Sequence, residues 1–381
     1  MDRESEQRRS EQHQSDGRES EQRRSDRREP DRRESGRRKS DRRELERREL
    51  SGKRHGRFAA VIIAGAAVLA VAGLGYAGIQ KKKAAEAASA KATAEADDSN
   101  TVTWQGKTYK YNQNLSNYLL LGVDKRTPAE TRVGKADAGQ ADALFLLSLN
   151  RKTKEMTLIS IPRDTMTDVE SFDLEGKSLG KSKDHISLSY GYGDGGAESC
   201  KLTQEAVSNL FYGLPIQGYL AMNLDGIPEL TKSVGGLTVT VPNNSLEYEY
   251  PEFVEGAEIT LTEENTEVFL RSRDVDESQS AIYRMERQKA FLDAFSKKAK
   301  ECYEQNAKFA ADLFVAIKPY TVTNISEDRL MKLFQTADEG DGYTEWTVPG
   351  EGTQGLSYDE YQVDDDVLYT KIMETFYQKI K

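Results

Sequence analysis

A long apolar stretch, from Phe58 to Ile79, constrains this chain of 381 residues more than any other feature. Its 22 residues include no charged side chain. A helix rises about 1.5 Å per residue, so this stretch can span a hydrocarbon core of about 30 Å. A buried core helix and a cleaved signal peptide are the alternatives, but charged residues flank both ends, and a signal peptide's apolar region is only about 7–15 residues long. We therefore predict an uncleaved transmembrane helix at residues 58–79.

The charge distribution predicts how this helix is oriented. Residues 1–57 carry 20 Lys and Arg against 15 Asp and Glu, a net charge of +5, whereas the rest of the chain carries −15. Seven basic residues lie within 42–57, but only four follow the apolar stretch over a similar distance: Lys81, Lys82, Lys83 and Lys91. Basic flanks stay preferentially in the cytoplasm. We expect a single-pass protein of the cell membrane with its N-terminus inside and its C-terminal domain extracytoplasmic.

Residues 1–57 are expected to form a disordered, Arg-rich cytoplasmic tail. Residues 1–50 repeat the pattern Ser-Asp/Glu-x-Arg-Arg and contain almost no apolar side chains to bury. The tail either contacts anionic lipid or a protein partner, or is a solvated determinant of topology. Its acidic residues nearly balance the basic ones and no aromatic residues interleave, which disfavours nucleic-acid binding.

The rest of the chain is predicted to be a linker, residues 80–100, and a folded domain, residues 101–381. Strand-like apolar runs lie at 117–123, 143–149, 155–161, 217–222 and 237–241. Helix-like stretches lie at 197–211, 224–234, 262–270, 282–304, 307–317, 327–336 and 366–380. Apolar strands between amphipathic helices indicate a sheet covered on both faces. The predicted fold class is therefore α/β.

The cysteines and histidines of the chain indicate neither a required disulfide nor a zinc site. The two cysteines, Cys200 and Cys302, both lie in the predicted external part, where a disulfide is possible but not required. The three histidines are scattered, and no pattern of paired cysteines or histidines supports a zinc site.

Charged side chains gather where apolar strands begin or end. The candidate residues in the strand regions are Asp124, Arg126, Gln140, Asp142, Arg163 and Asp164, and those further along are Arg271, Arg273, Arg284, Arg287 and Gln288. Aspartates without histidines suit Mg²⁺, which keeps several waters and bridges to phosphates. Guanidinium groups donate paired hydrogen bonds to phosphate oxygens. Together they describe a pyrophosphate site, although each residue alone is equally compatible with a surface salt bridge.

The order of these motifs resembles the LytR–CpsA–Psr (LCP) family. The resemblance rests on NYLLLGVDKR, QADALFLLSLNRKTKEMTLISIPRDT, NLDGIPELTKSVGGLTVTVP, FLRSRD and RMERQKAFL, which run colinearly from about Asn117 to Ala294. The family's architecture has a short cytoplasmic tail, one membrane helix and an external α-β-α sandwich domain. That architecture matches the topology expected above.

The resemblance implies a transferase, or ligase, of cell-wall biogenesis. Such an enzyme moves a glycopolymer, for example wall teichoic acid or capsule polysaccharide, from a polyprenyl-pyrophosphate carrier to a peptidoglycan hydroxyl. It implies Mg²⁺ on Asp124 and Asp142, and an apolar groove for the lipid between sheet and helices. Catalysis would involve Arg163, Asp164, Arg271 and Arg273, with Asp164 orienting Arg163. The pyrophosphate would contact Arg126, Gln140, Arg163, Arg271, Arg273, Arg284, Arg287 and Gln288.

The chain departs from the family pattern at three points, one of which is the length of the loop GVDKRTPAETRVGKADAGQ. Gln140 stands where the family usually has an arginine, and His185-Ile186-Ser187 replaces a Lys-Ile-Asn run. Arg132 or Lys135, in the long loop before Gln140, is a hypothetical source of the missing positive charge.

Other functions compatible with these motifs are a polyprenyl-pyrophosphate-binding scaffold, a pyrophosphatase and a membrane-bound regulator of the transcriptional-attenuator type. The regulator interpretation would place its action in the tail, but the tail shows no helix-turn-helix pattern. Transfer needs no ATP because the pyrophosphate bond supplies the energy, and the chain carries no P-loop. The sequence does not choose among Asp124, Asp142 and Asp164 as the acceptor of the hydroxyl proton.

Overall fold

The structure, a computed structural model, describes residues 101–126, 131–274, 276–326, 329–330, 333, 343–356 and 358–380. The expected tail, transmembrane helix and linker (residues 1–57, 58–79 and 80–100) lie outside these residues. Within the described ranges, no helix is both long enough and apolar enough to span a membrane.

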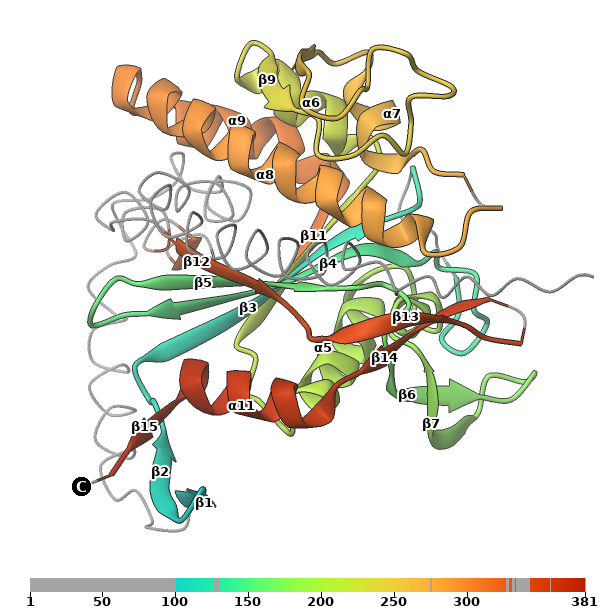
Figure 1. Cartoon of the computed structure of the whole chain (residues 1–381), viewed down its shortest axis with the longest axis vertical. Coiled ribbons are helices and arrows are strands. Elements are labelled where there is room, and N and C mark those ends of the chain that lie inside the picture. Colours follow the sequence, from blue (N-terminus) through green and yellow to red (C-terminus); the bar gives the residue numbers. More distant parts are fainter. Residues whose placement is uncertain are drawn as a thin grey trace, which may run out of the picture. The chain divides into compact units, whose positions relative to one another are not determined.

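A mixed sheet of six strands forms the centre of the domain (Figure 1). Its order is β11 (Thr321–Thr323), β8 (Gly218–Asn223), β3 (Leu115–Val123), β4 (Ala141–Asn150), β5 (Met156–Ile161) and β12 (Tyr343–Thr347). Strands β3 and β8 pair in parallel, as do β5 and β12, and the other neighbours are antiparallel. The four longest strands are those that the apolar runs predict.

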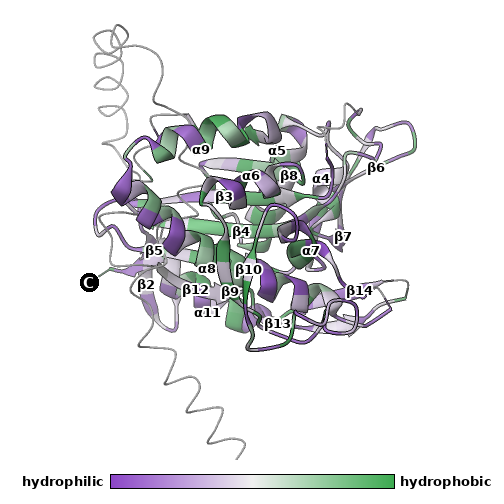
Figure 2. Cartoon of the chain, turned by 90° about the horizontal axis from the view of Figure 1, so that it is seen from above, coloured by the Kyte–Doolittle hydropathy of each residue, from purple (hydrophilic) through white to green (hydrophobic). Residues whose placement is uncertain are grey.

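The central strands are apolar on both faces because both faces are covered. Leu120 and Phe145 belong to one hydrophobic cluster, and the adjacent Leu119 and Leu146 belong to the other. Successive strand side chains point to opposite faces, so a strand buried on both sides needs a continuous apolar run. Figure 2 shows this as green strands between helices that carry purple outer faces.

Two helical layers cover the sheet (Figure 1). One layer contains α6 (Gly226–Ser233), α7 (Thr266–Arg271), α8 (Ser280–Gln305) and α9 (Phe309–Ile317), with the small sheet of β9 (Leu237–Thr240) and β10 (Glu258–Leu261). The other layer contains α4 (Leu188–Gly191), α5 (Ala197–Leu210) and α11 (Asp365–Phe376). The predicted α-β-α arrangement of the folded domain is therefore confirmed.

Several elements differ from the sequence prediction. The run at 237–241 forms β9, which pairs with β10 rather than joining the central sheet. The helix predicted to end at residue 380 ends at Phe376, and β15 (Tyr377–Lys379) pairs with β2 (Lys107–Tyr111) instead. Most of the helix predicted at 327–336 lies outside the described residues. The local sequence pattern predicts that the helix continues through residues 377–380. Hydrogen bonding to β2 makes residues 377–379 a strand instead.

Three hairpins were not predicted from the sequence. They are β1 (Thr101–Trp104) with β2, β6 (Met166–Phe172) with β7 (Ser178–His185), and β13 (Gly350–Gln354) with β14 (Asp359–Val363). Most of their side chains are polar and lie at the rim of the domain, so they lack a clear apolar alternation. A short turn, η2 (Lys318–Tyr320), leads into β11.

The two cysteines are not bonded to each other. Cys200 is buried in the cluster on the α5 side of the sheet, whereas Cys302 packs against the cluster on the α8 side. The sheet separates them, so the possible disulfide does not form.

Candidate functional site

One edge of the central sheet collects the polar residues that the sequence singled out. Asp124 follows the end of β3, and Arg163 follows the end of β5. Asp142 is the second residue of β4, rather than preceding that strand as predicted. Because β4 runs antiparallel to both neighbours, its beginning lies beside their ends. The hairpin connections therefore bring three separate motifs together.

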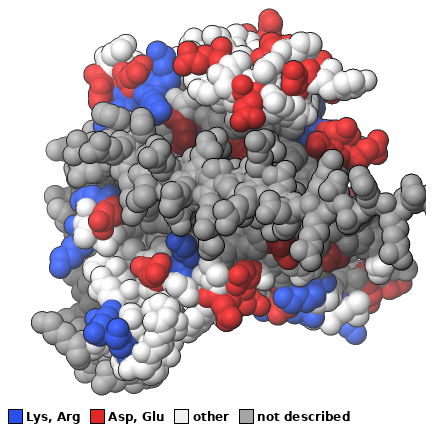
Figure 3. Space-filling view, in the orientation of Figure 1, with Lys and Arg blue, Asp and Glu red and all other residues white. Residues whose placement is uncertain are grey.

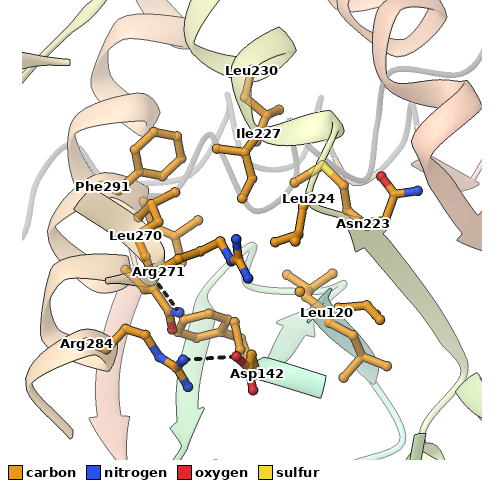
Figure 4. A pocket seen from close by; sticks show the side chains of 18 of the residues that line it. Leu120, Asp142, Asn223, Leu224, Ile227, Leu230, Leu270, Arg271, Arg284 and Phe291 are labelled. Carbon is orange, nitrogen blue, oxygen red and sulfur yellow. Dashed lines mark hydrogen bonds and ion pairs between the residues drawn. The ribbon is translucent and has the colours of Figure 1, made fainter. Parts of the chain in front are cut away.

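Arg163 donates hydrogen bonds to three side chains at this edge. Its Nη1 donates to an oxygen of Asp142, its Nη2 donates to Oε1 of Gln140, and its Nε donates to Oδ1 of Asp164 at 3.2 Å. Arg284, from α8, donates from Nη1 to the other Asp142 oxygen at 2.9 Å. We call Gln140, Asp142, Arg163, Asp164 and Arg284 the Asp142 cluster. Figure 4 shows Asp142 and Arg284 facing each other at one end of a cavity.

Gln140 links one of the two predicted metal ligands, Asp124, to Arg163. Its backbone N–H donates to Oδ1 of Asp124 at 2.6 Å, while its side chain accepts from Arg163. Lys135 does not supply positive charge here, because its Nζ donates to the carbonyl oxygen of Leu174. An apolar cavity and a polar cavity border the cluster, and neither Lys135 nor Arg132 lines either of them.

Arg284 carries an unsatisfied donor into the site. Only 5% of its surface is exposed, and its Nη2 has no hydrogen-bond partner among the described residues. Burial lowers the pKa of this guanidinium, and the carboxylate of Asp142 opposes that shift. Buried donors normally have partners, so a buried cation with a free N–H group indicates a place for an anionic acceptor.

Arg287 has a different environment from the one predicted for a phosphate contact. It is fully buried; its Nε donates to the carbonyl of Phe269 at 2.8 Å, and its Nη1 and Nη2 donate to Ser245 Oγ and the carbonyl of Ser272. Burial lowers its pKa to about 10, which leaves it charged at neutral pH. These hydrogen bonds connect α8 to α7 and to the segment that follows it, which carries Arg273.

The remaining predicted residues lie around the cluster at varying distances. Gln288 donates from Nε2 to the carbonyl of Leu270 at 3.3 Å, and Arg273 donates to Ser280 Oγ at 3.1 Å. Arg271 pairs with Glu267 at 2.8 Å. Arg126 pairs with Asp225 and with the same Glu267, and more than half of its side chain is exposed. The structure thus brings Arg271 and Arg126 together through one shared carboxylate.

An apolar cavity of about 140 Å³ opens beside the cluster, between the sheet and helices α6, α7 and α8. In Figure 4, Leu230, Ile227 and Phe291 lie at one end, and Arg284 and Asp142 lie at the other. Arg271 and Gln288 also line it. A long apolar chain with an anionic end matches this distribution of side chains.

A polar cavity of about 720 Å³ adjoins the same cluster. Gln140, Arg163, Asp164, Arg273 and His185 line it, together with residues of the β13–β14 hairpin. His185 places Nδ1 3.2 Å from the Asp184 carboxylate and Nε2 2.9 Å from the carbonyl of Asp359. The hydrogen bond to Asp184 raises the pKa of His185. Both ring nitrogens thus face acceptors, an arrangement that favours the protonated form of the ring.

The two arginines of the Asp142 cluster are buried rather than part of a basic surface patch. In the face seen in Figure 3, Asp and Glu lie over both the upper and lower elements, and Lys and Arg form small separate groups. By contrast, Arg163 and Arg284 are mostly buried, with 15% and 6% of their side chains exposed. Charges that are shielded from water interact more strongly with an anion.

Asp124 and Asp142 fit a cation that takes few protein ligands. Asp124 follows β3 and Asp142 lies near the start of the neighbouring β4, and the described residues hold no group of three or more acidic, histidine or cysteine side chains that could bind a metal. Mg²⁺ bound to substrate phosphates typically uses one or two carboxylates and several waters. Both Asp142 oxygens are held by arginines, so an added cation would have to share them.

Sequence reasoning missed some residues of the site. Asn223 ends β8 beside Asp124, lines the apolar cavity, and has a buried Oδ1 without a hydrogen-bond partner in the described part of the chain. It follows an apolar strand, which is the same signal that selected Asp124. Ser245, Tyr358 and Asp359 have no such signal, because loops and hairpins far along the chain bring them to the site.

Comparisons of the sequence with known proteins identify a family and named relatives. The model of the LytR_cpsA_psr family matches residues 76–375. A protein of Bacillus licheniformis named polyisoprenyl-teichoic acid--peptidoglycan teichoic acid transferase TagU is 28% identical over 255 residues, covering 66% of this chain and 73% of the relative. TagU of Bacillus mycoides is also 28% identical, over 253 residues, covering 65% and 73%.

Solved structures share the fold. Protein gbs0355 of Streptococcus agalactiae superposes with a TM-score of 0.54 at 20% identity, covering 68% of this chain and 87% of that one. A structure described as TagT bound to LI-WTA superposes with a TM-score of 0.52 at 19% identity, covering 69% and 90%.

Proposed function

The chain belongs to the LytR_cpsA_psr family, and from this membership and the geometry of the Asp142 cluster we propose that it is a glycopolymer–peptidoglycan transferase. It would take an anionic glycopolymer, of the wall teichoic acid or capsule type, from a polyprenyl-pyrophosphate carrier and attach it to peptidoglycan. The transferase names of the TagU relatives support this proposal. The observation that carries it is Arg284, a buried arginine that lines the apolar cavity and has one donor without a partner among the described residues.

Each part of the substrate has a matching region. The polyprenyl tail would occupy the apolar cavity against Ile227, Leu230 and Phe291. The pyrophosphate would lie at the Asp142 cluster, where Arg284 and Arg163 donate to its oxygens. Arg271, which lines the apolar cavity next to Arg284, would contact it from the α7 side. Arg287 would position α8 rather than touch the substrate.

The reaction is a displacement at phosphorus. The oxygen of a peptidoglycan hydroxyl forms a bond to the phosphorus that carries the glycopolymer, and the bond from that phosphorus to the polyprenyl phosphate breaks. The hydroxyl proton passes to a carboxylate, and the leaving group is polyprenyl phosphate. Arginines held in place before the reaction stabilise the charge that develops on the phosphoryl oxygens.

Asp164 is the best placed of the three candidate proton acceptors. Both oxygens of Asp142 are held by arginines, and Asp124 accepts the backbone N–H of Gln140. Asp164 lines the polar cavity, and only its Oδ1 is used by Arg163. Its hydrogen bond to Arg163 would also hold that guanidinium in orientation.

Mg²⁺ is proposed as the cofactor, held by Asp124 and Asp142. When bound, it would neutralise part of the charge on the pyrophosphate. Arg163 and Arg284 would turn from Asp142 to the phosphate oxygens, which would leave the carboxylate available to the cation.

The test is a transfer assay with the full-length protein in detergent. A polyprenyl-pyrophosphate-linked oligosaccharide and uncrosslinked peptidoglycan oligomers are incubated with Mg²⁺ or with EDTA, and products are followed by mass spectrometry. We expect a phosphodiester-linked product that requires Mg²⁺ and is lost in Asp142→Ala and Arg163→Ala.

The alternatives give different results in the same assay. Binding of the donor without a linked product would identify a scaffold, and Gln140→Arg would then be the next variant. Release of phosphorylated sugar without the acceptor would identify a pyrophosphatase. Either result would overturn the transferase proposal.

A further inference from the structure

The β13–β14 hairpin forms one wall of the polar cavity. Gln354, Leu356, Tyr358 and Asp359 from this hairpin line the cavity, as do Arg163 and Asp164. Figure 1 shows the hairpin extending beside the start of the long helix α8. The Asp142 cluster therefore lies between an apolar cavity and a polar cavity that this hairpin helps to enclose.

The hairpin is fixed to segments that carry the site. The backbone N–H of Tyr361 donates to the carbonyl of Asp164 at 2.8 Å, and His185 contacts the carbonyl of Asp359 at 2.9 Å. The Asp359 carboxylate accepts the backbone N–H of Gln279, just before α8, at 2.6 Å. These contacts attach β14, as far as the residue beside the turn, to Asp164, His185 and the residue that precedes α8.

Two apolar side chains near the tip remain exposed. Tyr358 is 77% exposed and Leu356 is fully exposed. The Tyr358 ring lies edge-on to the imidazole of His185, with 6.4 Å between the ring centres. An exposed aromatic ring beside polar groups suits a sugar, which has an apolar C–H face and a rim of hydroxyl groups.

The geometry of the displacement at phosphorus indicates whether the donor sugar or the acceptor sugar lies in the polar cavity. The attacking and leaving oxygens are roughly in line across phosphorus. With the polyprenyl chain in the apolar cavity, the leaving oxygen lies on that side of the Asp142 cluster. The attacking hydroxyl must then approach from the opposite side, which is the polar cavity.

We propose that the tip of the β13–β14 hairpin is the subsite for the acceptor, in which Tyr358 and Leu356 pack against sugar rings of a peptidoglycan glycan strand. This inference rests on the transferase function proposed above. Tyr358 and Leu356 set the position of the acceptor, and Asp164 then faces its hydroxyl.

The test compares kinetic constants for the two substrates in the full-length protein. Tyr358→Ala and Leu356→Ala should each raise the KM for peptidoglycan oligomers by about three- to tenfold, the range expected for losing one packed ring or side chain. The KM for the lipid-linked donor and the melting temperature should stay at wild-type values. Tyr358→Phe keeps the ring and should keep the wild-type acceptor KM.

Exposed residues elsewhere provide matched controls. Tyr248→Ala and Leu174→Ala remove side chains that are fully exposed and 90% exposed, respectively, outside both cavities, and should leave both KM values unchanged.

The possible failures are distinguishable. If the wild-type protein forms no linked product, the transferase function itself is wrong. If it does form product and both alanine variants keep the wild-type acceptor KM, the acceptor subsite is wrong. A rise confined to the donor KM would also overturn it, because the hairpin would then contact the donor. Leu356 is fully exposed, so its variant remains informative even if Tyr358→Ala folds poorly.

Discussion

At the residue scale, two arginines one helical turn apart serve different purposes. Among the residues that the structure describes, Arg284 Nη2 has no hydrogen-bond partner, whereas Nε, Nη1 and Nη2 of Arg287 each donate to a protein oxygen. A guanidinium whose three nitrogens all donate to protein oxygens is part of the framework. One with a free donor inside a cavity is available to a ligand.

Replacing Arg287 should therefore lower stability more than it changes binding. Arg287→Lys keeps the charge but cannot make three hydrogen bonds in a fixed planar arrangement. We expect a loss of about 3–5 kcal/mol in the free energy of unfolding, as for other buried charges that lose their partners. Urea unfolding measures it, with Arg271→Lys as the more exposed control. A stable Arg287→Lys protein that no longer binds the donor would instead indicate a direct phosphate contact.

His185 should make the stability of the domain depend on pH. Its pKa is raised by Asp184, so its contribution is complete below the ordinary histidine pKa of about 6.5 and disappears as pH rises through the raised value. The contact also lowers the pKa of Asp184, which stays ionised throughout this range. Arg163, Arg273 and Asp164 line the same cavity as His185.

The measurement compares urea unfolding of the wild-type protein and His185→Gln at about pH 5.5 and about pH 9. The stability difference between the two proteins should be larger at the acidic pH. An equal difference at both values would show that the imidazolium contributes nothing.

At the scale of elements, α6, α7 and α8 leave space above the sheet instead of closing on it. The space is lined by Leu120, Phe145, Leu230 and Phe291, all of which are otherwise buried in the same hydrophobic cluster. Well-packed interiors leave few voids, so an apolar cavity that ends at buried arginines indicates a binding site.

Filling this cavity should select against long lipid tails. Ile227→Trp places a larger side chain in the cavity from α6. Each buried CH₂ group contributes about 0.8 kcal/mol, so displacing two of them weakens binding about tenfold. Binding of long-chain polyprenyl pyrophosphate should fall by at least this factor, while a short-chain analogue keeps its affinity. Equal loss for both ligands would mean that the tail lies elsewhere.

At the scale of the whole molecule, the described domain is one part of a longer chain. The acidic C-terminal part and the basic first 57 residues would lie on opposite sides of a membrane if residues 58–79 span it. Transfer to peptidoglycan requires the domain to be outside, so the proposed function and the proposed topology depend on each other.

A protease-protection experiment tests this topology. In intact spheroplasts, an impermeant protease should digest the domain at 101–381 and leave an epitope fused before Met1 protected. Permeabilised cells, in which both parts are cut, are the control. Protection of the domain in intact cells would contradict the extracytoplasmic location. Deleting residues 2–50 should leave transfer activity intact, whereas a regulator acting through the tail would lose its function.

The sequence by itself determined the layers of the domain and the local position of most site residues. Apolar runs bounded by helices predict a sheet covered on both faces, because burial on both sides requires continuous apolar strands. Asp124 and Arg163 could be selected because each follows such a run. Only the tertiary structure decided which donors stay free: the partners of Arg287 come from Phe269, Ser272 and Ser245, which no pattern around Arg287 specifies. The same holds for the β13–β14 hairpin, since its polar strands are held at the site by long-range hydrogen bonds that local sequence does not encode.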